Sequence, residues 1–105
     1  EGKSYDLQYA NNKSDLYDPS KHYSFIRSYD RDMILIVVNF SDIDANLGIT
    51  IPSHAFDFLG SECKIATSGV DMIDGSVISE KIQPDTKYKI FVKRNWVRIL
   101  KFSLQ

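Results

Sequence analysis

The sequence predicts an all-β fold, an antiparallel two-sheet sandwich of about seven or eight short strands. Apolar residues recur with the period of two that strands require, and Asp, Asn, Gly and Pro residues interrupt these stretches at short intervals. No stretch shows the periodicity of a long helix. The 105 residues are near the usual size of one domain, so residues 1–105 are expected to form a single β-sandwich domain.

An alternating stretch and a continuous apolar stretch dominate the first half of the chain. In HYSFIRSYD, aromatic residues alternate with serines, which gives one aromatic face and one small polar face. After an acidic turn, MILIVV at residues 33–38 is apolar without alternation, as expected of a central strand covered on both faces. We therefore expect this strand to be the most sensitive part of the chain, with Ile36→Ala lowering the melting midpoint far more than Asp44→Ala.

Turn signals divide the second half into further strands. LGITIP alternates cleanly, and IPSHAFDFLG is expected to form one turn of helix or a tight bend that brings Phe56 and Phe58 onto the core. CKIATS leads to Asp-Gly at residues 74–75, the best hairpin signal in the chain, and Pro-Asp at residues 84–85 marks another turn. The closing TKYKIFVKRNWVRILKFSL is predicted to form two strands joined near residues 94–95.

The stretch SDIDANLGIT begins like a calcium-binding loop. Asp42, Asp44 and Asn46 occupy alternate positions, as the first ligands of an EF-hand do. The sixth and twelfth positions hold Leu47 and Ser53 in place of the required Gly and bidentate Glu. Because the flanking segments have strand patterns, we interpret the stretch as the hairpin loop between two strands and expect no metal site.

Composition excludes several classes of function. Thirteen basic and 14 acidic residues give a net charge of -1 without long runs of either sign, so neither a nucleic-acid partner nor a membrane surface is expected. Cys63 is the only cysteine, so the chain has no intrachain disulfide, and a small apolar filler is the expected role. The chain starts with Glu1, which suggests a piece of a longer protein and leaves a periplasmic or a cytoplasmic location equally open.

No constellation of catalytic residues is evident. His22 and His54 lie far apart in sequence beside predicted structural elements, and no nucleophile elbow, phosphate loop or zinc motif occurs, so neither a catalytic residue nor a cofactor is expected. The aspartates, Asp71 included, fall mainly in predicted loops, where solvated turns explain them. Asn39 lies in a sequon but ends the most apolar strand, so it is expected to hold backbone groups rather than a glycan.

Two aromatic residues are candidates for stacking against a sugar. Trp96 and Tyr17 are large aromatic residues whose rings could stack on a sugar. Single aromatic residues on strands are nevertheless more often core or interface residues than ligand platforms. We retain both residues as the candidate sugar-stacking positions of the chain.

The order of these features resembles the C-terminal all-β domain of bacterial alpha-amylase superfamily glycoside hydrolases, especially those of Bacteroidetes-like bacteria. The similarity rests on YSFIRSYDRDMILIVVNFS (residues 23–41), on ITIPSHAF, and on KYKIFVKRNWVRILKF, which is similar to the family's final hairpin. It extends over essentially the whole chain. The resemblance implies a two-sheet Greek-key sandwich that packs against a catalytic (β/α)8 barrel of the same polypeptide, which hydrolyses alpha-glucans. Such a barrel needs about 250 residues, so the catalytic residues lie outside this chain.

Three functions remain open at this stage. The first is a structural domain that stabilises the barrel, and it is favoured because MILIVV and WVRIL do not alternate, which predicts an apolar patch on an outer sheet surface. The second is a carbohydrate-binding module whose partner is alpha-glucan, which would show two or three coplanar exposed rings. The third is an immunoglobulin-like interaction domain without any link to sugar.

Overall fold

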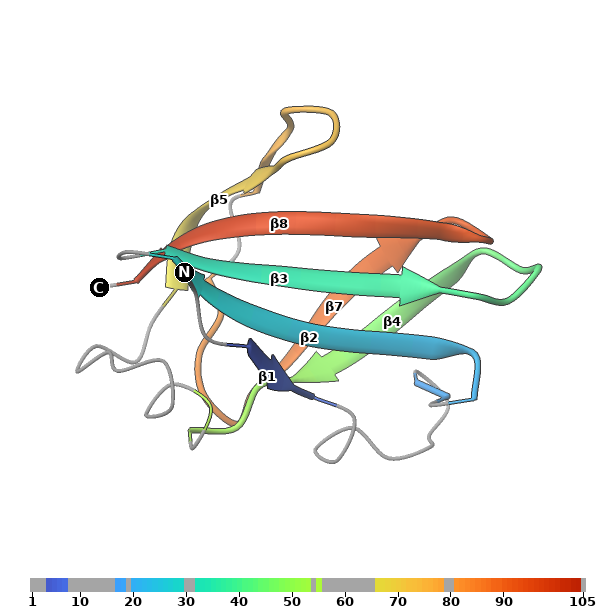
Figure 1. The fold of residues 1–105 in the computed structure, drawn as a ribbon, viewed down its shortest axis with the longest axis horizontal. Coiled ribbons are helices and arrows are strands. Elements are labelled where there is room, and N and C mark those ends of the chain that lie inside the picture. The colour runs from blue at the N-terminus through green and yellow to red at the C-terminus, as the bar shows by residue number, and fades with distance from the viewer. Residues whose placement is uncertain are drawn as a thin grey trace.

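The computed structural model describes residues 4–7, 17–18, 20–29, 32–53, 55, 66–78 and 81–104. These residues form eight strands in two antiparallel sheets, which confirms the predicted all-β sandwich (Figure 1). The strands are β1 (Ser4–Asp6), β2 (His22–Tyr29), β3 (Asp32–Asn39), β4 (Ala45–Thr50), β5 (Ala66–Asp71), β6 (Val77–Ile78), β7 (Lys87–Val92) and β8 (Trp96–Leu104). The described part contains no helix that is long and apolar enough to cross a membrane.

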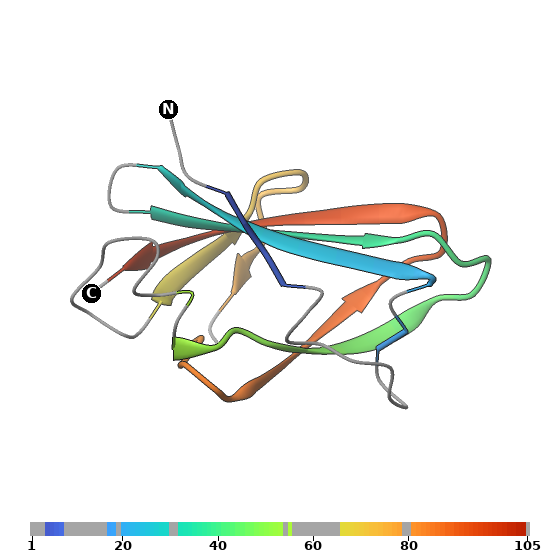
Figure 2. The same ribbon diagram turned by 60° about the horizontal axis from the view of Figure 1, so that its bottom comes forward.

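The larger sheet has the strand order β1-β2-β3-β8-β5-β6, and the smaller sheet consists of β4 and β7. The smaller sheet lies across one face of the larger one (Figure 2). The chain passes from the larger to the smaller sheet after β3 and again after β6, and it returns to the larger sheet after β4 and after β7. Two predicted connections are therefore wrong: residues 41–44 and residues 93–95 join strands of different sheets, and neither closes a hairpin. Sequence spacing places a turn but does not determine which strands pair.

The predicted turns lie where the sequence signals placed them. Gly75 has φ +79° in the connection between β5 and β6, which pair as an antiparallel hairpin. Asp85 and Asn95 also adopt positive φ values, 60° and 48°, which Asp and Asn tolerate better than most residues. The bend predicted after β4 is described only at residues 51–53 and 55, where the Ala55 N–H donates to the Pro52 carbonyl at 2.9 Å.

The core lies between the two sheets and is built from alternate residues of their strands. Strands β3 and β7 show a strict alternation of burial, as sheets with one covered face do. The rings of Tyr88 and Phe102 pack edge to face across the core, with their centroids 6.1 Å apart. The fully buried strand residues of this core are Ile26, Met33, Leu35, Val37, Leu47, Ile49, Val92, Leu100 and Phe102.

Strand β3 is central in the sheet but is covered on one face only. Met33, Leu35 and Val37 are 0% exposed, whereas Ile34 and Ile36 are only partly buried. The expectation of burial on both faces is therefore wrong for this chain, because the smaller sheet covers one side and no described element covers the other. Substitution should therefore lower the stability more at Met33, Leu35 or Val37 than at Ile36.

Strand β2 turns its small polar face inward. Ser24 is 0% exposed, and its hydroxyl is hydrogen-bonded to the hydroxyl of buried Tyr17 at 3.0 Å. The aromatic side chains of Tyr23 and Phe25 lie on the opposite face and remain partly exposed. The larger sheet therefore carries aromatic and aliphatic side chains on the face directed away from the core.

Asn39 joins the two sheets at one end of the sandwich. Its side chain is completely buried, and its amide group donates to the carbonyls of Ile43 at 3.0 Å and Val92 at 3.1 Å. Its side-chain oxygen accepts from the Ser41 N–H at 2.9 Å. One side chain thus satisfies backbone groups at the end of β3, before β4 and at the end of β7, which confirms the structural role expected for Asn39.

The first prediction compares adjacent positions of β3 in the isolated chain. Leu35→Ala should lower the free energy of unfolding by about 2–5 kcal/mol, because it leaves a cavity between the sheets. Ile36→Ala should cost about 1 kcal/mol, because its side chain is already partly exposed. Urea titrations followed by circular dichroism measure both values, with exposed Asp42→Ala as the control. Equal losses at positions 35 and 36 would contradict the assignment of inner and outer faces.

The second prediction concerns the amide of Asn39. Asn39→Ala should cost about 2–4 kcal/mol, because it leaves buried backbone groups without partners. Asn39→Asp should be less stable at pH 7 than at pH 4, because a carboxylate would face two carbonyl oxygens. Thermal melts at both pH values test this, with Asn46→Ala and Asn46→Asp at an exposed position as matched controls. Unfolding midpoints that do not differ between the two sites would refute the role of Asn39.

Candidate functional site

The larger sheet presents an apolar surface on the side away from the core, which we call the outer apolar face. Two cross-strand rows form it: Phe25, Ile36 and Ile99 in one register, and Tyr23, Val38 and Val97 in the next. These side chains, together with Ile34, are partly exposed because they shield one another but no described element forms a layer above them. The predicted apolar patch on an outer sheet surface is therefore present.

The outer apolar face ends at a polar rim, and beyond Lys101 the β5–β6 hairpin carries two further exposed apolar side chains. Val70 is 40% exposed and Val77 is 82% exposed, and they pair with each other. Val70 also pairs with Lys101, whose ammonium group forms an ion pair with Asp32 at 3.4 Å. Charged Arg27 is exposed on the same side of β2. A contiguous apolar surface with a charged border is typical of a protein–protein contact.

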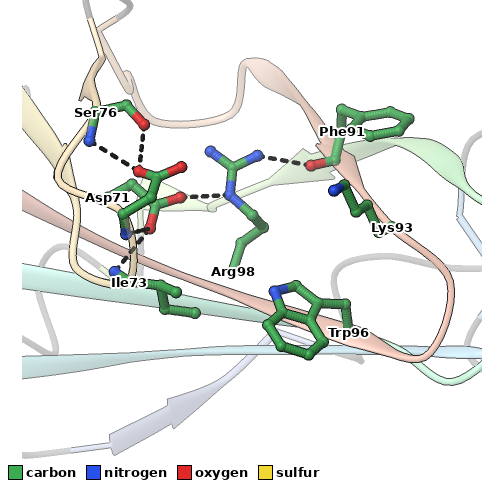
Figure 3. Close-up of a pocket in the computed structure, with 8 residues that line it drawn as sticks. Asp71, Ile73, Ser76, Phe91, Lys93, Trp96 and Arg98 are labelled. Carbon is green, nitrogen blue, oxygen red and sulfur yellow. Dashed lines mark hydrogen bonds and ion pairs between the residues drawn. The ribbon is translucent and has the colours of Figure 1, made fainter.

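A second feature is a pocket of about 560 Å³ near one edge of the sandwich, where the β5–β6 hairpin approaches the ends of β7 and β8 (Figure 3). Such a volume is within the range of small-molecule sites, about 300–1,000 Å³. The hairpin, the end of β7 and the start of β8 line it with Asp71, Ile73, Asp74, Ser76, Phe91, Lys93, Trp96 and Arg98. We call it the hairpin pocket.

A partly buried ion pair between Asp71 and Arg98 organises the hairpin pocket. Asp71 is 2% exposed, and one of its oxygens accepts from Nε of Arg98 at 2.6 Å. Its other oxygen accepts from the backbone N–H of Ile73 at 2.8 Å, so the same carboxylate also shapes the turn. Nη1 of Arg98 donates to the Phe91 carbonyl at 2.7 Å. The guanidinium is thereby fixed between the two sheets (Figure 3).

The mouth of the hairpin pocket carries one acidic, one basic and one aromatic side chain. The Asp74 carboxylate accepts from the N–H and hydroxyl of Ser76, which lower its pKa, so it is ionised at neutral pH. Lys93 is exposed and lines the pocket. Trp96 is 52% exposed and lies beside Arg98 (Figure 3). The pocket thus combines fixed polar groups with an accessible ring.

The structure separates the two candidate sugar-stacking residues. Trp96 lies in the hairpin pocket with its ring accessible, and its role in binding stays a prediction. Tyr17 is 2% exposed and packs beside His22 with ring centroids 5.6 Å apart. The face of the Tyr17 ring is therefore not accessible to a sugar, and Tyr17 does not fit the stacking role expected from the sequence.

The acidic loop before β4 has a structural use. Asp44 accepts from the Arg94 backbone N–H at 2.9 Å, which ties the loop to the turn between β7 and β8. Asp42 and Asn46 are exposed. The described ranges contain no group of three or more His, Cys, Asp or Glu side chains placed to hold a metal ion.

The histidines contribute no catalytic arrangement to the described part of the chain. His22 is buried, and its Nδ1 accepts from the Asp18 backbone N–H at 3.0 Å. Burial lowers the pKa of His22, against the opposing effect of the Asp18 carboxylate. His54 and Cys63, like Phe56 and Phe58, lie outside the described residues.

Sequence analysis missed the Asp71–Arg98 pair. Asp71 was assigned to a solvated turn, but it ends β5 and is almost fully buried. The available signal was Arg98 itself, which takes an inward position on β8 between Trp96 and Leu100. A cation at such a position requires a carboxylate partner, yet the sequence does not indicate which carboxylate supplies it.

Comparisons with known proteins connect the fold to solved structures. No protein-family model and no curated protein matches the sequence. A crystal structure described as an alpha-N-acetylgalactosaminidase from Bacillus halodurans matches with a TM-score of 0.62 and 13% identity over 97% of this chain and 20% of that chain. A GH27 beta-L-arabinopyranosidase from Geobacillus stearothermophilus in complex with arabinose matches with a TM-score of 0.58 and 10% identity over 86% of this chain and 19% of that chain. This chain therefore spans about a fifth of each of these bacterial proteins and shares its β-sandwich fold with them.

Proposed function

We propose that this chain is a non-catalytic domain of a glycoside hydrolase and that it stabilises the catalytic domain of the same polypeptide by packing the outer apolar face against it. The observation that carries the proposal is the outer apolar face itself. Antiparallel sheets exposed to water on one side carry polar residues there, whereas β3 places Ile34, Ile36 and Val38 on that side. A covering domain removes this apolar surface from water.

The energetics favour a partner within the same polypeptide. Interfaces between domains of one chain bury about 600–1,500 Å². If only about 300 Å² of that area is apolar surface of this domain, the gain is roughly 7 kcal/mol. A tethered partner also avoids most of the translational and rotational cost of association. The gain is comparable to the whole stability of a domain, about 5–15 kcal/mol.

The assignment to a glycosidase is supported by two independent likenesses. Both matched structures are described as glycosidases, and this chain spans about a fifth of each, as an accessory domain would. The sequence resemblance to alpha-amylase superfamily domains favours the same class of enzyme. The two likenesses differ in the family of the parent enzyme, so we propose a glycoside hydrolase as the parent and, as its more specific form, a member of the alpha-amylase superfamily that acts on alpha-glucans.

The alternative of a flat aromatic platform for glycan binding has less support. The ring pairs in contact within the described ranges are tilted or edge-on, with interplanar angles of 54°, 42° and 89°. Tyr17, Tyr88 and Phe102 belong to the core. An immunoglobulin-like interaction domain would also use an exposed apolar face. The complete reading frame distinguishes the two proposals, because only the glycosidase proposal requires that it also encode a catalytic domain.

The third prediction compares the isolated chain with the polypeptide encoded by the complete reading frame. Ile36→Lys and Ile99→Lys should each change the unfolding free energy of the isolated chain by about 1 kcal/mol or less, because the ammonium group can reach water. In the longer polypeptide the same substitutions should lower the melting midpoint by about 5 °C or more, because the charge would be buried in the contact. Differential scanning calorimetry measures both.

Ile43→Lys is the matched control, since Ile43 is 65% exposed in a loop away from the outer apolar face. It should have little effect in either form. Small effects of all three substitutions in the longer polypeptide would overturn the proposed contact. A reading frame without a glycosidase domain would overturn the assignment to a glycoside hydrolase and leave the contact to be explained by a different partner.

A further inference from the structure

The hairpin pocket is independent of the outer apolar face. Its principal side chains, Trp96 and Arg98, are at inward positions of β8, whereas the outer apolar face uses the intervening residue Val97 together with Ile99. A domain that covers the outer apolar face therefore does not need to enter the pocket. Ligand binding in the hairpin pocket is therefore independent of the proposed contact with a catalytic domain.

Arg98 brings fixed hydrogen-bond donors to the pocket. A guanidinium has five N–H groups, and two of its nitrogens, Nε and Nη1, are engaged by Asp71 and the Phe91 carbonyl. Nη2 has no recorded partner within the described part of the chain, and Figure 3 shows it on the same side of the guanidinium as the Asp71 contact and away from the Phe91 carbonyl. Because the guanidinium is already held in place, a ligand that accepts from Nη2 does not have to immobilise the side chain.

The charges that line the hairpin pocket cancel. Asp71 is neutralised by Arg98, with a contact of 2.6 Å. The remaining charged groups are the carboxylate of Asp74 and the ammonium of Lys93, one of each sign. A phosphate or another strong anion would meet Asp74, and a cation would meet Lys93 and Arg98. The balance favours a neutral ligand that can both donate and accept hydrogen bonds.

Trp96 adds an aromatic surface next to these polar groups. Its ring is 52% exposed, and the side chain of Ile73, 47% exposed, lines the same pocket. Apolar surface with a few fixed polar groups is the usual composition of a small-molecule site. A pyranose ring has the matching chemistry, because its C–H face packs on an aromatic ring and its hydroxyl groups donate and accept at the edge.

We propose that the hairpin pocket binds a neutral saccharide, with one sugar ring against Trp96 and its hydroxyl groups bonded to Nη2 of Arg98 and the carboxylate of Asp74. The carboxylate oxygen of Asp74 that Ser76 does not contact accepts a hydrogen bond from a sugar hydroxyl group. Lys93 at the mouth donates to a further hydroxyl oxygen. The pocket holds the sugar without any chemical step.

The fourth prediction uses Trp96 as its own reporter, since it is the only tryptophan in the chain. Titration of the isolated chain with maltotetraose, cellotetraose and raffinose should shift or quench tryptophan emission in a saturable way for at least one of them. Asp74→Asn should raise the dissociation constant at least about tenfold, as expected for the loss of a charged hydrogen-bond acceptor. Asp74→Asn retains the oxygen that accepts from Ser76, so the turn should remain folded.

Two controls make the result specific to the pocket. Asp42→Asn makes the same charge change in an exposed loop and should leave the dissociation constant unchanged. Trp96→Ala, followed by calorimetry because it lacks the reporter, should abolish binding, whereas Phe40→Ala removes another exposed ring that does not line the pocket and should preserve binding.

The proposal is overturned if none of the three neutral oligosaccharides gives a saturable response at about 30 mM. It is also overturned if inorganic phosphate or a sulfated sugar binds and the neutral sugars do not, or if Asp42→Asn weakens binding as much as Asp74→Asn does. Binding in the isolated chain tests the pocket alone, so its failure leaves the contact through the outer apolar face untouched.

Discussion

The structure depends on one constraint, the apolar character of both faces of β3. The strand is paired on both sides, with β2 and β8, so it can be covered only from above and below. The smaller sheet covers Met33, Leu35 and Val37 completely. The same backbone then directs Ile34, Ile36 and Val38 outward, because successive side chains of a strand point to opposite faces. Closing the sandwich therefore creates the outer apolar face.

Two side-chain contacts join the two sheets near one end of the sandwich. Asn39 links the end of β3 to the end of β7, and Arg98 links β8 to β7 through the Phe91 carbonyl. These contacts connect the two layers at the same end that holds the hairpin pocket. The outer apolar face and the hairpin pocket thus come from alternate residues of β8, which allows one domain to have a docking surface and a ligand site without competition between them.

The sequence was sufficient for features that depend on local chemistry. Strand periodicity, the Asp-Gly turn at Gly75 and the structural role of Asn39 all follow from residue type and spacing. The pairing of β7 with β4 and of β8 with β3 depends on contacts between distant segments, and an alternating pattern is the same for either pairing. Alternation also defines two faces of a strand without indicating which face is covered. The sequence therefore does not show that Ser24 points inward, where its hydroxyl contacts that of buried Tyr17.

The candidate site was predictable only in part, for the same reason. Trp96 could be selected from the sequence as a large aromatic residue, but a separation of 27 positions along the chain conceals the ion pair between Asp71 and Arg98. Tyr17 resembled Trp96 in sequence and differs from it entirely in burial. The sequence therefore supplied the aromatic component of the hairpin pocket, and the tertiary structure supplied its charges and its shape.

The central claim is that another domain of the same polypeptide covers the outer apolar face. The most direct measurement is an experimental structure of the polypeptide encoded by the complete reading frame, in which the exposed areas of Ile34, Ile36, Val38, Val97 and Ile99 are compared with those of the isolated domain. The account predicts that all five side chains become buried against a neighbouring catalytic domain. If they remain as exposed as they are in the isolated domain, the account is wrong.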